Sequence, residues 1–152
     1  MLLNTASAVI SFLTRLEEET AKFYEELSRK YPEGKEIFQS FSKENEKNKS
    51  IIQRVYYGVI TDALEACFSF REGMDSQNYV IKTETAEDAS FVSILKSALE
   101  IEETIRKAYI DAAELSEGLM ADVPQAFRAV GKKRSDRITK LAAILAGGSH
   151  VK

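Results

Sequence analysis

The residues that interrupt helices are few in this chain, and most of them lie between long periodic segments. The 152 residues include only two prolines and seven glycines. Between them, apolar side chains recur at spacings of three and four residues, which is the period of an amphipathic helix. The pattern predicts an all-α protein with one domain over residues 1–148 and a tail over 149–152. We expect its helices at about residues 4–30, 35–68, 87–116 and 123–145.

Two kinds of connection join these helices. The turn "YPEG" (31–34) and the break after Gly118 are short, so each should produce an antiparallel helical hairpin. The stretch 71–86 has no helical period and can extend about 60 Å, enough to run the length of a helix. It ends in a candidate capping box, "TAED" (85–88), and Asp122 is the candidate N-cap of the last helix. The order of hairpin, long crossover connection and hairpin predicts a ferritin-like four-helix bundle.

Composition narrows the classes of partner. The net charge of -3 and the pI near 5.4 give no general attraction to nucleic acid or to anionic membranes. No apolar stretch reaches the roughly 20 residues of a membrane span, and no basic segment precedes the apolar N-terminus as in a signal peptide. Cys67 is the only cysteine, which excludes an internal disulfide and cysteine-based metal sites. We expect a cytoplasmic protein that forms a homodimer through an outer helix face and contacts a protein partner that the sequence does not name.

Each predicted helix has polar residues in the middle of its apolar stripe. The apolar spacing continues through these positions, so the stripe that should face the interior is polar at its centre and apolar at its ends. Counted from the two turns, the polar positions of the four helices lie at similar heights. They therefore predict one polar layer across the core. Its residues are Glu17, Asn45, Asn48, Glu102, Arg134 and Arg137.

The two halves of the chain also match each other. "LEEETAKFY" (16–24) corresponds to "IEETIRKAY" (101–109), and in both a Glu precedes a Tyr by seven residues. "IFQSFSKENEKNKSII" (37–52) corresponds likewise to "AFRAVGKKRSDRITKL" (126–141), which places Asn45 on Arg134 and Asn48 on Arg137. This correspondence indicates an internal duplication.

This layout resembles that of the ferritin-like, rubrerythrin-type di-iron proteins, and the resemblance covers nearly the whole chain. In that family, a Glu on the first and third helices and a Glu-x-x-His pair on the second and fourth hold two irons, and this site serves the oxidation of ferrous iron or the reduction of peroxide. Glu17 and Glu102 match that pattern. The resemblance also implies that Tyr24 and Tyr109 donate hydrogen bonds to ligand carboxylates, while their position in the stripe predicts core rings with satisfied hydroxyls.

The other four ligand positions hold residues that do not suit a metal. Asn45 and Asn48 form one pair, and Arg134 and Arg137 form the other. An arginine is permanently cationic and has no lone pair to donate, whereas two arginines do balance the charge of two carboxylates. We therefore expect a non-catalytic, metal-free protein without cofactors, acting as a structural or interaction protein, with a buried Glu/Asn/Arg layer in place of the di-iron site.

Two other functions fit parts of the pattern. The first is a rubrerythrin-like oxidoreductase or peroxidase with iron or manganese, in which a small register shift brings other carboxylates inward. The residues of that displaced site would be Glu17, Glu44, Glu46, Glu102 and Asp136. The second is a binder of a small anion that uses Arg134 and Arg137 as a fork within the bundle, provided that the two buried Glu residues leave their charge free.

Overall fold

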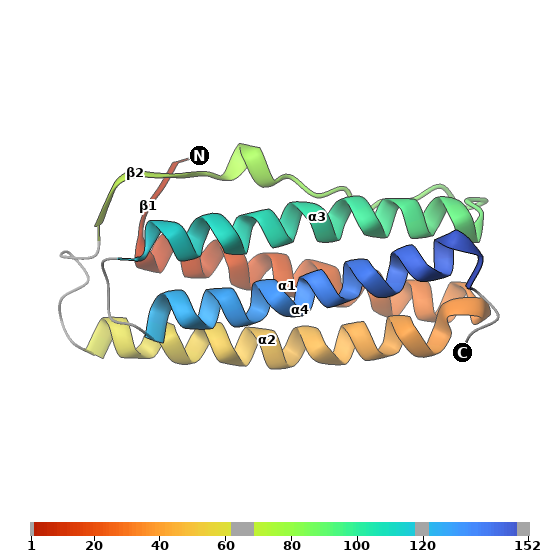
Figure 1. The fold of residues 1–152 in the computed structure, drawn as a ribbon, viewed down its shortest axis with the longest axis horizontal. Coiled ribbons are helices and arrows are strands. Elements are labelled where there is room, and N and C mark those ends of the chain that lie inside the picture. The colour runs from red at the N-terminus through yellow and green to blue at the C-terminus, as the bar shows by residue number, and fades with distance from the viewer. Residues whose placement is uncertain (1, 62–68, 118–121, 149–152) are drawn as a thin grey trace.

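The computed structural model describes residues 2–61, 69–117 and 122–148, most of which lie in four long helices. These are α1 (Ala6–Lys30), α2 (Lys35–Thr61), α3 (Phe91–Leu115) and α4 (Asp122–Ala143). The helices α1 and α2 form one antiparallel pair across the short 3-10 helix η1 (Pro32–Gly34), and α3 and α4 form the other (Figure 1). The predicted all-α class and the predicted break after the first helix are thus confirmed.

The segment between the hairpins runs along the outside of α3 from one end of the molecule to the other (Figure 1). It contains β2 (Ser69–Asp75) and the 3-10 helix η3 (Ser76–Tyr79), and it then continues without regular structure to residue 90. Because this segment spans the full helix length, α3 runs parallel to α2 and the second hairpin lies beside the first (Figure 1). The predicted crossover at 71–86 falls within it.

A small sheet fastens the N-terminus to this crossover, and the sequence did not predict it. The strand β1 (Leu2–Thr5) pairs antiparallel with β2, with Leu2 opposite Asp75 and Leu3 opposite Met74. Gly73 has a φ of +70°, and a Cβ there would come within 2.7 Å of the Leu3 carbonyl oxygen. The first helix therefore begins at Ala6 rather than near Asn4, and the Thr5 hydroxyl accepts a hydrogen bond from the Ala8 N–H (3.1 Å).

The start of the third helix also differs from its prediction. Thr85 does not cap a helix; α3 begins at Phe91, where the Ser90 hydroxyl accepts from the Ser93 N–H (3.1 Å). The stretch before it is held to the first hairpin, because the Tyr31 hydroxyl donates to the Ala89 carbonyl (2.6 Å). These contacts keep the chain non-helical beyond the candidate capping box.

The ends of the other helices complete the comparison with the sequence. Asp122 is the first residue of α4 rather than its N-cap. That helix ends at Ala143, two residues before the predicted end, and passes into the π turn η4 (Ile144–Gly148), where Gly147 has a φ of +103°. The predicted end of the second helix near Phe68, Cys67 and the tail at 149–152 lie outside the described residues.

The core between the four helices is apolar at both ends and aromatic at the end near η1. The Tyr24 ring stacks on Phe38 (centroids 5.8 Å apart) and meets Phe41 edge-on (5.1 Å), and Phe38 in turn contacts Phe91 (6.2 Å). Gly34 lets the turn approach this cluster, since a Cβ there would lie 2.7 Å from the Phe38 ring. These contacts join α1, α2 and the start of α3 at one end of the core.

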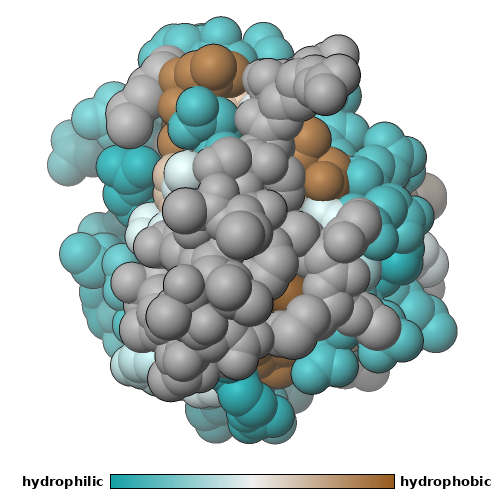
Figure 2. Space-filling view, turned by 90° about the vertical axis from the view of Figure 1, so that its left-hand side faces the viewer, coloured by the Kyte–Doolittle hydropathy of each residue, from teal (hydrophilic) through white to brown (hydrophobic). Residues whose placement is uncertain are grey.

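The surface is consistent with the interior being the apolar part of the molecule. Viewed from the end that carries β1 and β2, the described residues at the rim are mainly hydrophilic, with a few apolar ones between them (Figure 2). Over the ranges that the structure describes, no helix is both long enough and apolar enough to cross a membrane.

Candidate functional site

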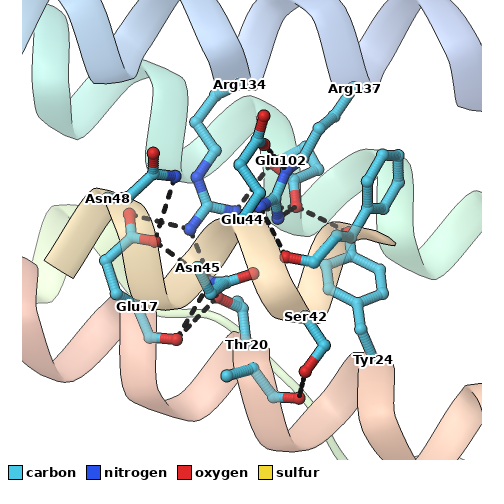
Figure 3. Close-up of polar contacts among 12 residues, drawn as sticks. Glu17, Thr20, Tyr24, Ser42, Glu44, Asn45, Asn48, Glu102, Arg134 and Arg137 are labelled. Atoms are coloured by element: carbon cyan, nitrogen blue, oxygen red, sulfur yellow. Dashed lines mark hydrogen bonds and ion pairs between the residues drawn. The ribbon is translucent and has the colours of Figure 1, made fainter. Parts of the chain in front are cut away.

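The structure brings all six residues of the predicted polar layer together. They come from four different helices, and each is 0–1% exposed. Arg134 and Arg137 are among the largest fully buried side chains of the described residues. Figure 3 shows them extending from α4 toward the carboxylates and amides of the other three helices. The polar layer, as we call this group of six, therefore crosses the whole core.

Glu102 has more cationic partners than Glu17. Arg134 Nη1 donates to both of its carboxylate oxygens, at 2.9 Å to Oε1 and 2.8 Å to Oε2. Arg137 Nη1 donates to Oε2 at 3.3 Å, and the Tyr24 hydroxyl donates to the same oxygen at 2.6 Å. The carboxylate thus has two cations and one hydroxyl as partners, which is the kind of compensation that a buried charge requires.

Glu17 has mainly neutral partners. Asn45 and Asn48 donate from Nδ2 to its Oε1, at 3.0 and 3.3 Å, and the Tyr109 hydroxyl donates to Oε2 at 2.6 Å. Its one cationic partner among the described residues is Arg134, whose Nη2 lies 2.9 Å from Oε2. Arg134 therefore forms ion pairs with both buried carboxylates and joins the two hairpins.

The two tyrosines cross between the halves. Tyr24 on α1 donates to Glu102 on α3, and Tyr109 on α3 donates to Glu17 on α1. Both rings are fully buried, so each serves as core and as a carboxylate partner at once. The reciprocal exchange gives this part of the molecule the twofold character that the internal duplication predicts.

Two further residues complete the network, and the sequence did not assign them to it. The Thr20 hydroxyl accepts from Asn45 Nδ2 (2.5 Å) and from Arg134 Nη2 (3.2 Å). Glu44 accepts from Arg137 Nε at 2.8 Å although its side chain is 33% exposed. Thr20 lies in the predicted stripe, three residues after Glu17, and that spacing was the available signal. Glu44 lies beside the stripe and reaches Arg137 through the length of its side chain.

Arg137 is fixed by hydrogen bonds to several acceptors and by contacts with two aromatic rings. Besides Glu44 and Glu102, its Nη2 donates to the Phe41 carbonyl oxygen at 2.8 Å. Its guanidinium carbon lies 4.7 Å from the Phe41 ring centroid and 5.5 Å from that of Tyr24. A planar guanidinium can stack on rings while donating in its own plane, whereas an ammonium cannot. Arginine at position 137 can therefore make contacts that a lysine there could not make.

The network shifts the proton affinities of its members. Burial raises the pKa of Glu102, but the charges of Arg134 and Arg137 and the hydrogen bonds to the carboxylate outweigh it, so its pKa lies below the ordinary value. Burial lowers the pKa of Arg134, but Glu102 and Glu17 raise it well above its usual range. Burial, followed by the adjacent carboxylate charge, raises the pKa of Tyr24 and of Tyr109. The layer thus consists of ionised Glu102, charged Arg134 and neutral tyrosines over the ordinary pH range.

Three buried polar atoms have no hydrogen-bond partner among the described residues. They are Oδ1 of Asn45, Oδ1 of Asn48 and Nε of Arg134. The two amide oxygens are acceptors and the Arg134 Nε–H is a donor, and buried polar groups without a partner cost free energy. The layer is therefore incompletely satisfied at the two amides and at Arg134 Nε, while the carboxylate of Glu102 is surrounded by donors.

The donor set does not fit a di-metal site. The two guanidiniums have no lone pairs and repel cations, and they already neutralise Glu17 and Glu102. Within residues 2–61, 69–117 and 122–148, no group of three or more His, Cys, Asp or Glu side chains is arranged to hold a metal ion. The register shift needed for the displaced carboxylate site is not present either. Glu46 and Asp136 are exposed, because Phe41, Ile52 and Leu141 keep the interior positions.

Comparison with protein-family models, with curated proteins and with solved structures gives no significant match to this chain. The assignment of a function to the polar layer therefore depends on its geometry and chemistry.

Proposed function

We propose that this chain is a non-catalytic, metal-free member of the ferritin-like superfamily that acts as a structural or interaction protein. The observation that carries the proposal is the position of Arg134, whose Nη atoms lie within 2.9 Å of both buried carboxylates. In rubrerythrin-type proteins, which the sequence resembles, the corresponding carboxylates bind metal. A guanidinium between them supplies the countercharge that they need and removes the donors that a metal needs.

The charges of the fully buried groups support this proposal. Two carboxylates and two guanidiniums sum to zero, and the amides and hydroxyls of the layer are neutral. Such a layer gives little net stability compared with apolar packing, since desolvation offsets most of the attraction. Its value lies in specifying which helices pair and at which height, because a displaced helix would leave a buried charge unpaired. A scaffold of defined shape is the role that this suits.

Metal content tests the proposal directly. The untagged protein would be produced with added iron and manganese, dialysed without chelator and subjected to elemental analysis. We expect close to no metal per chain. About two metals per chain would overturn the proposal and favour the di-metal oxidoreductase, for which peroxidase and ferroxidase assays would then be run.

A redesigned protein provides the positive control. The four substitutions Asn45→Glu, Asn48→His, Arg134→Glu and Arg137→His restore the donor types of the family at the matching positions. We expect the folded variant to bind iron or manganese where the parent protein does not. Failure of the folded variant to bind either metal would show that these four positions do not correspond to the ligand positions of the family.

The two other candidate functions receive less support. A displaced carboxylate site would need Glu46 and Asp136 to leave the surface. Anion binding by Arg134 and Arg137 within the bundle would need the buried carboxylates to release them, and both arginines are bonded to Glu102. Formation of a homodimer stays a prediction, which light scattering of the purified protein would test.

A further inference from the structure

A basic pocket lies on the outer side of the polar layer, between α2 and α4. Its volume is about 400 Å³. Four lysines line it, Lys43 and Lys47 from α2 and Lys133 and Lys140 from α4. Phe41, Glu44 and Arg137 also contribute, so the inner wall of the pocket is the edge of the buried network.

The charge of this pocket is opposite to that of the chain. Five basic and two acidic side chains, Glu44 and Asp136, line it, which gives a net charge of +3 in a protein whose overall charge is -3. None of the four lysines forms an ion pair within the part of the chain that the structure describes. Like charges on neighbouring turns repel each other, so the cluster costs the folded protein free energy when nothing binds there. A polyanion would relieve that repulsion.

Arg137 and Glu44 give the pocket a specific inner contact. Arg137 is 1% exposed, and its Nε donates to Glu44 Oε1 at 2.8 Å. The Glu44 carboxylate is partly exposed, and Arg137 is its one side-chain partner among the described residues, whereas Arg137 is also fixed by Glu102 and by the Phe41 carbonyl oxygen. Figure 3 shows Glu44 beside the Arg137 guanidinium. Because Arg137 keeps its contacts to Glu102 and to the Phe41 carbonyl oxygen, an anion in the pocket can take the place of the Glu44 carboxylate without moving Arg137.

We propose that the α2/α4 pocket binds a small polyanion that carries phosphate groups. One phosphate would accept from Arg137 in place of Glu44, and the lysines would neutralise the remaining charge. The size of the pocket favours a small molecule, and the negative charge of the whole chain opposes a long polyanion such as nucleic acid. The inference goes beyond the proposed function and does not depend on whether the core binds metal.

Titration calorimetry of the full chain with sodium pyrophosphate would test this site. Inorganic phosphate and citrate serve as parallel ligands, which separate the effects of charge number and of phosphate chemistry. We expect saturable binding of one pyrophosphate per chain at about 50 mM salt, weakened at least about fivefold at about 300 mM salt. The absence of saturable pyrophosphate binding at the lower salt concentration, or equal affinity for citrate, would overturn the proposal.

Two matched variants locate the binding. Lys47→Gln with Lys140→Gln removes two charges from the pocket, and we expect it to weaken pyrophosphate binding about tenfold. Lys35→Gln with Lys132→Gln removes two charges from exposed positions of the same helices outside the pocket, and its affinity should stay within about twofold of the parent. Equal weakening by both pairs would show a general charge effect and sink the assignment to this pocket.

Glu44→Gln tests the exchange at Arg137. It removes the competing negative charge and leaves the Arg137 contacts to the core intact, so we expect pyrophosphate to bind about threefold to tenfold more tightly. Unchanged or weaker binding by this folded variant would show that the anion does not replace Glu44. Metal content is unaffected by any of these results, so a failure here is distinct from a failure of the proposed function.

Discussion

Glu17 and Glu102 occupy equivalent positions in the two halves of the molecule, yet the chain satisfies them in different ways. Both are fully buried, and each accepts from a tyrosine of the other half at 2.6 Å. Around Glu17 the other partners are two amides and one arginine, whereas Glu102 has two arginines. The difference arises at the paired positions 45/134 and 48/137, where one half holds amides and the other guanidiniums.

This asymmetry shows that the countercharge is shared unequally. The first hairpin contributes a carboxylate and no cation to the layer, and the second contributes a carboxylate and both cations. Arg134 compensates for the imbalance by contacting both carboxylates. The helices of the two halves thus occupy equivalent positions, but the first half needs an arginine of the second half to neutralise its buried carboxylate.

The largest effect should come from removing the shared cation. Arg134→Met leaves two buried carboxylates with Arg137 as their only cation, and we expect it to lower the free energy of unfolding by about 3–5 kcal/mol. Urea denaturation followed by circular dichroism measures the loss. Lys132→Met is the matched control, because Lys132 is exposed on the same helix. A loss of stability no greater than that of the control would show that Arg134 does not balance the two carboxylates.

The next largest loss of stability should come from removing Glu102, the carboxylate with two arginine partners. Glu102→Ala strands two arginines and should cost about 3 kcal/mol, and Glu17→Ala, which leaves Arg134 paired with Glu102, should cost less. Glu103→Ala serves as the control, since Glu103 is exposed. Thermal and urea melts would rank the three variants. Equal destabilisation by the substitutions at 102 and 103 would contradict the assignment of Glu102 to the interior.

The stability of the folded protein should depend on pH through the ionisation of Glu102. The folded protein lowers the pKa of Glu102, so folding favours its ionised form, and the stability linked to it is complete above the ordinary value of 4.5. That stability is lost as the pH falls from there through the lower pKa of the folded state. Urea midpoints at a series of pH values should therefore fall more steeply for the parent protein than for Glu102→Gln. Parallel curves below pH 4.5 would contradict this linkage.

The smallest losses of stability should come from removing the two amide side chains, Asn45 and Asn48, and the two losses should differ. Asn45 donates to the Glu17 carboxylate, to the Glu17 carbonyl oxygen (2.9 Å) and to Thr20. Within the described part of the chain, Asn48 donates only to the carboxylate, at 3.3 Å. We expect Asn45→Ala to cost about 1–2 kcal/mol and Asn48→Ala less than about 1 kcal/mol. Urea denaturation at neutral pH would compare them. The reverse order would mean that the Asn48 contact is the stronger one.

The sequence predicted the parts of the molecule that follow from helical periodicity. The spacing of Glu17, Asn45 and Glu102 within apolar stripes placed them in the interior, and the short turn at 31–34 defined the first hairpin. Periodicity works here because long helices have few alternatives once their apolar stripe must be covered. It also predicted that the rings of Tyr24 and Tyr109 lie in the core, whereas hydrogen bonds from their hydroxyls to carboxylates were implied only by the resemblance, and the crossing of these bonds between the halves was not predicted.

The remaining features depend on contacts between distant segments. The strand β1 pairs with β2, which lies about seventy residues later in the chain, and no local pattern in "LLNT" predicts this pairing. Ser90 caps α3 instead of Thr85 because the preceding residues are bonded to Tyr31 and Lys30 of the first hairpin. Glu44 joins the network through side-chain reach, a property that depends on where Arg137 ends and therefore on the packed structure.

The two hairpins pack in a nearly symmetric way, as the crossed hydrogen bonds of Tyr24 and Tyr109 show, but they carry different charges. A bundle of this shape can in principle be assembled from two identical hairpins related by a twofold axis. Two copies of the first hairpin would bury a pair of carboxylates with no cation, and two copies of the second would bury four guanidiniums against two carboxylates. Neither homodimer balances its charge, whereas the present pair does. The two hairpins are therefore complementary in charge, and the crossover joins the two members of the pair in one chain.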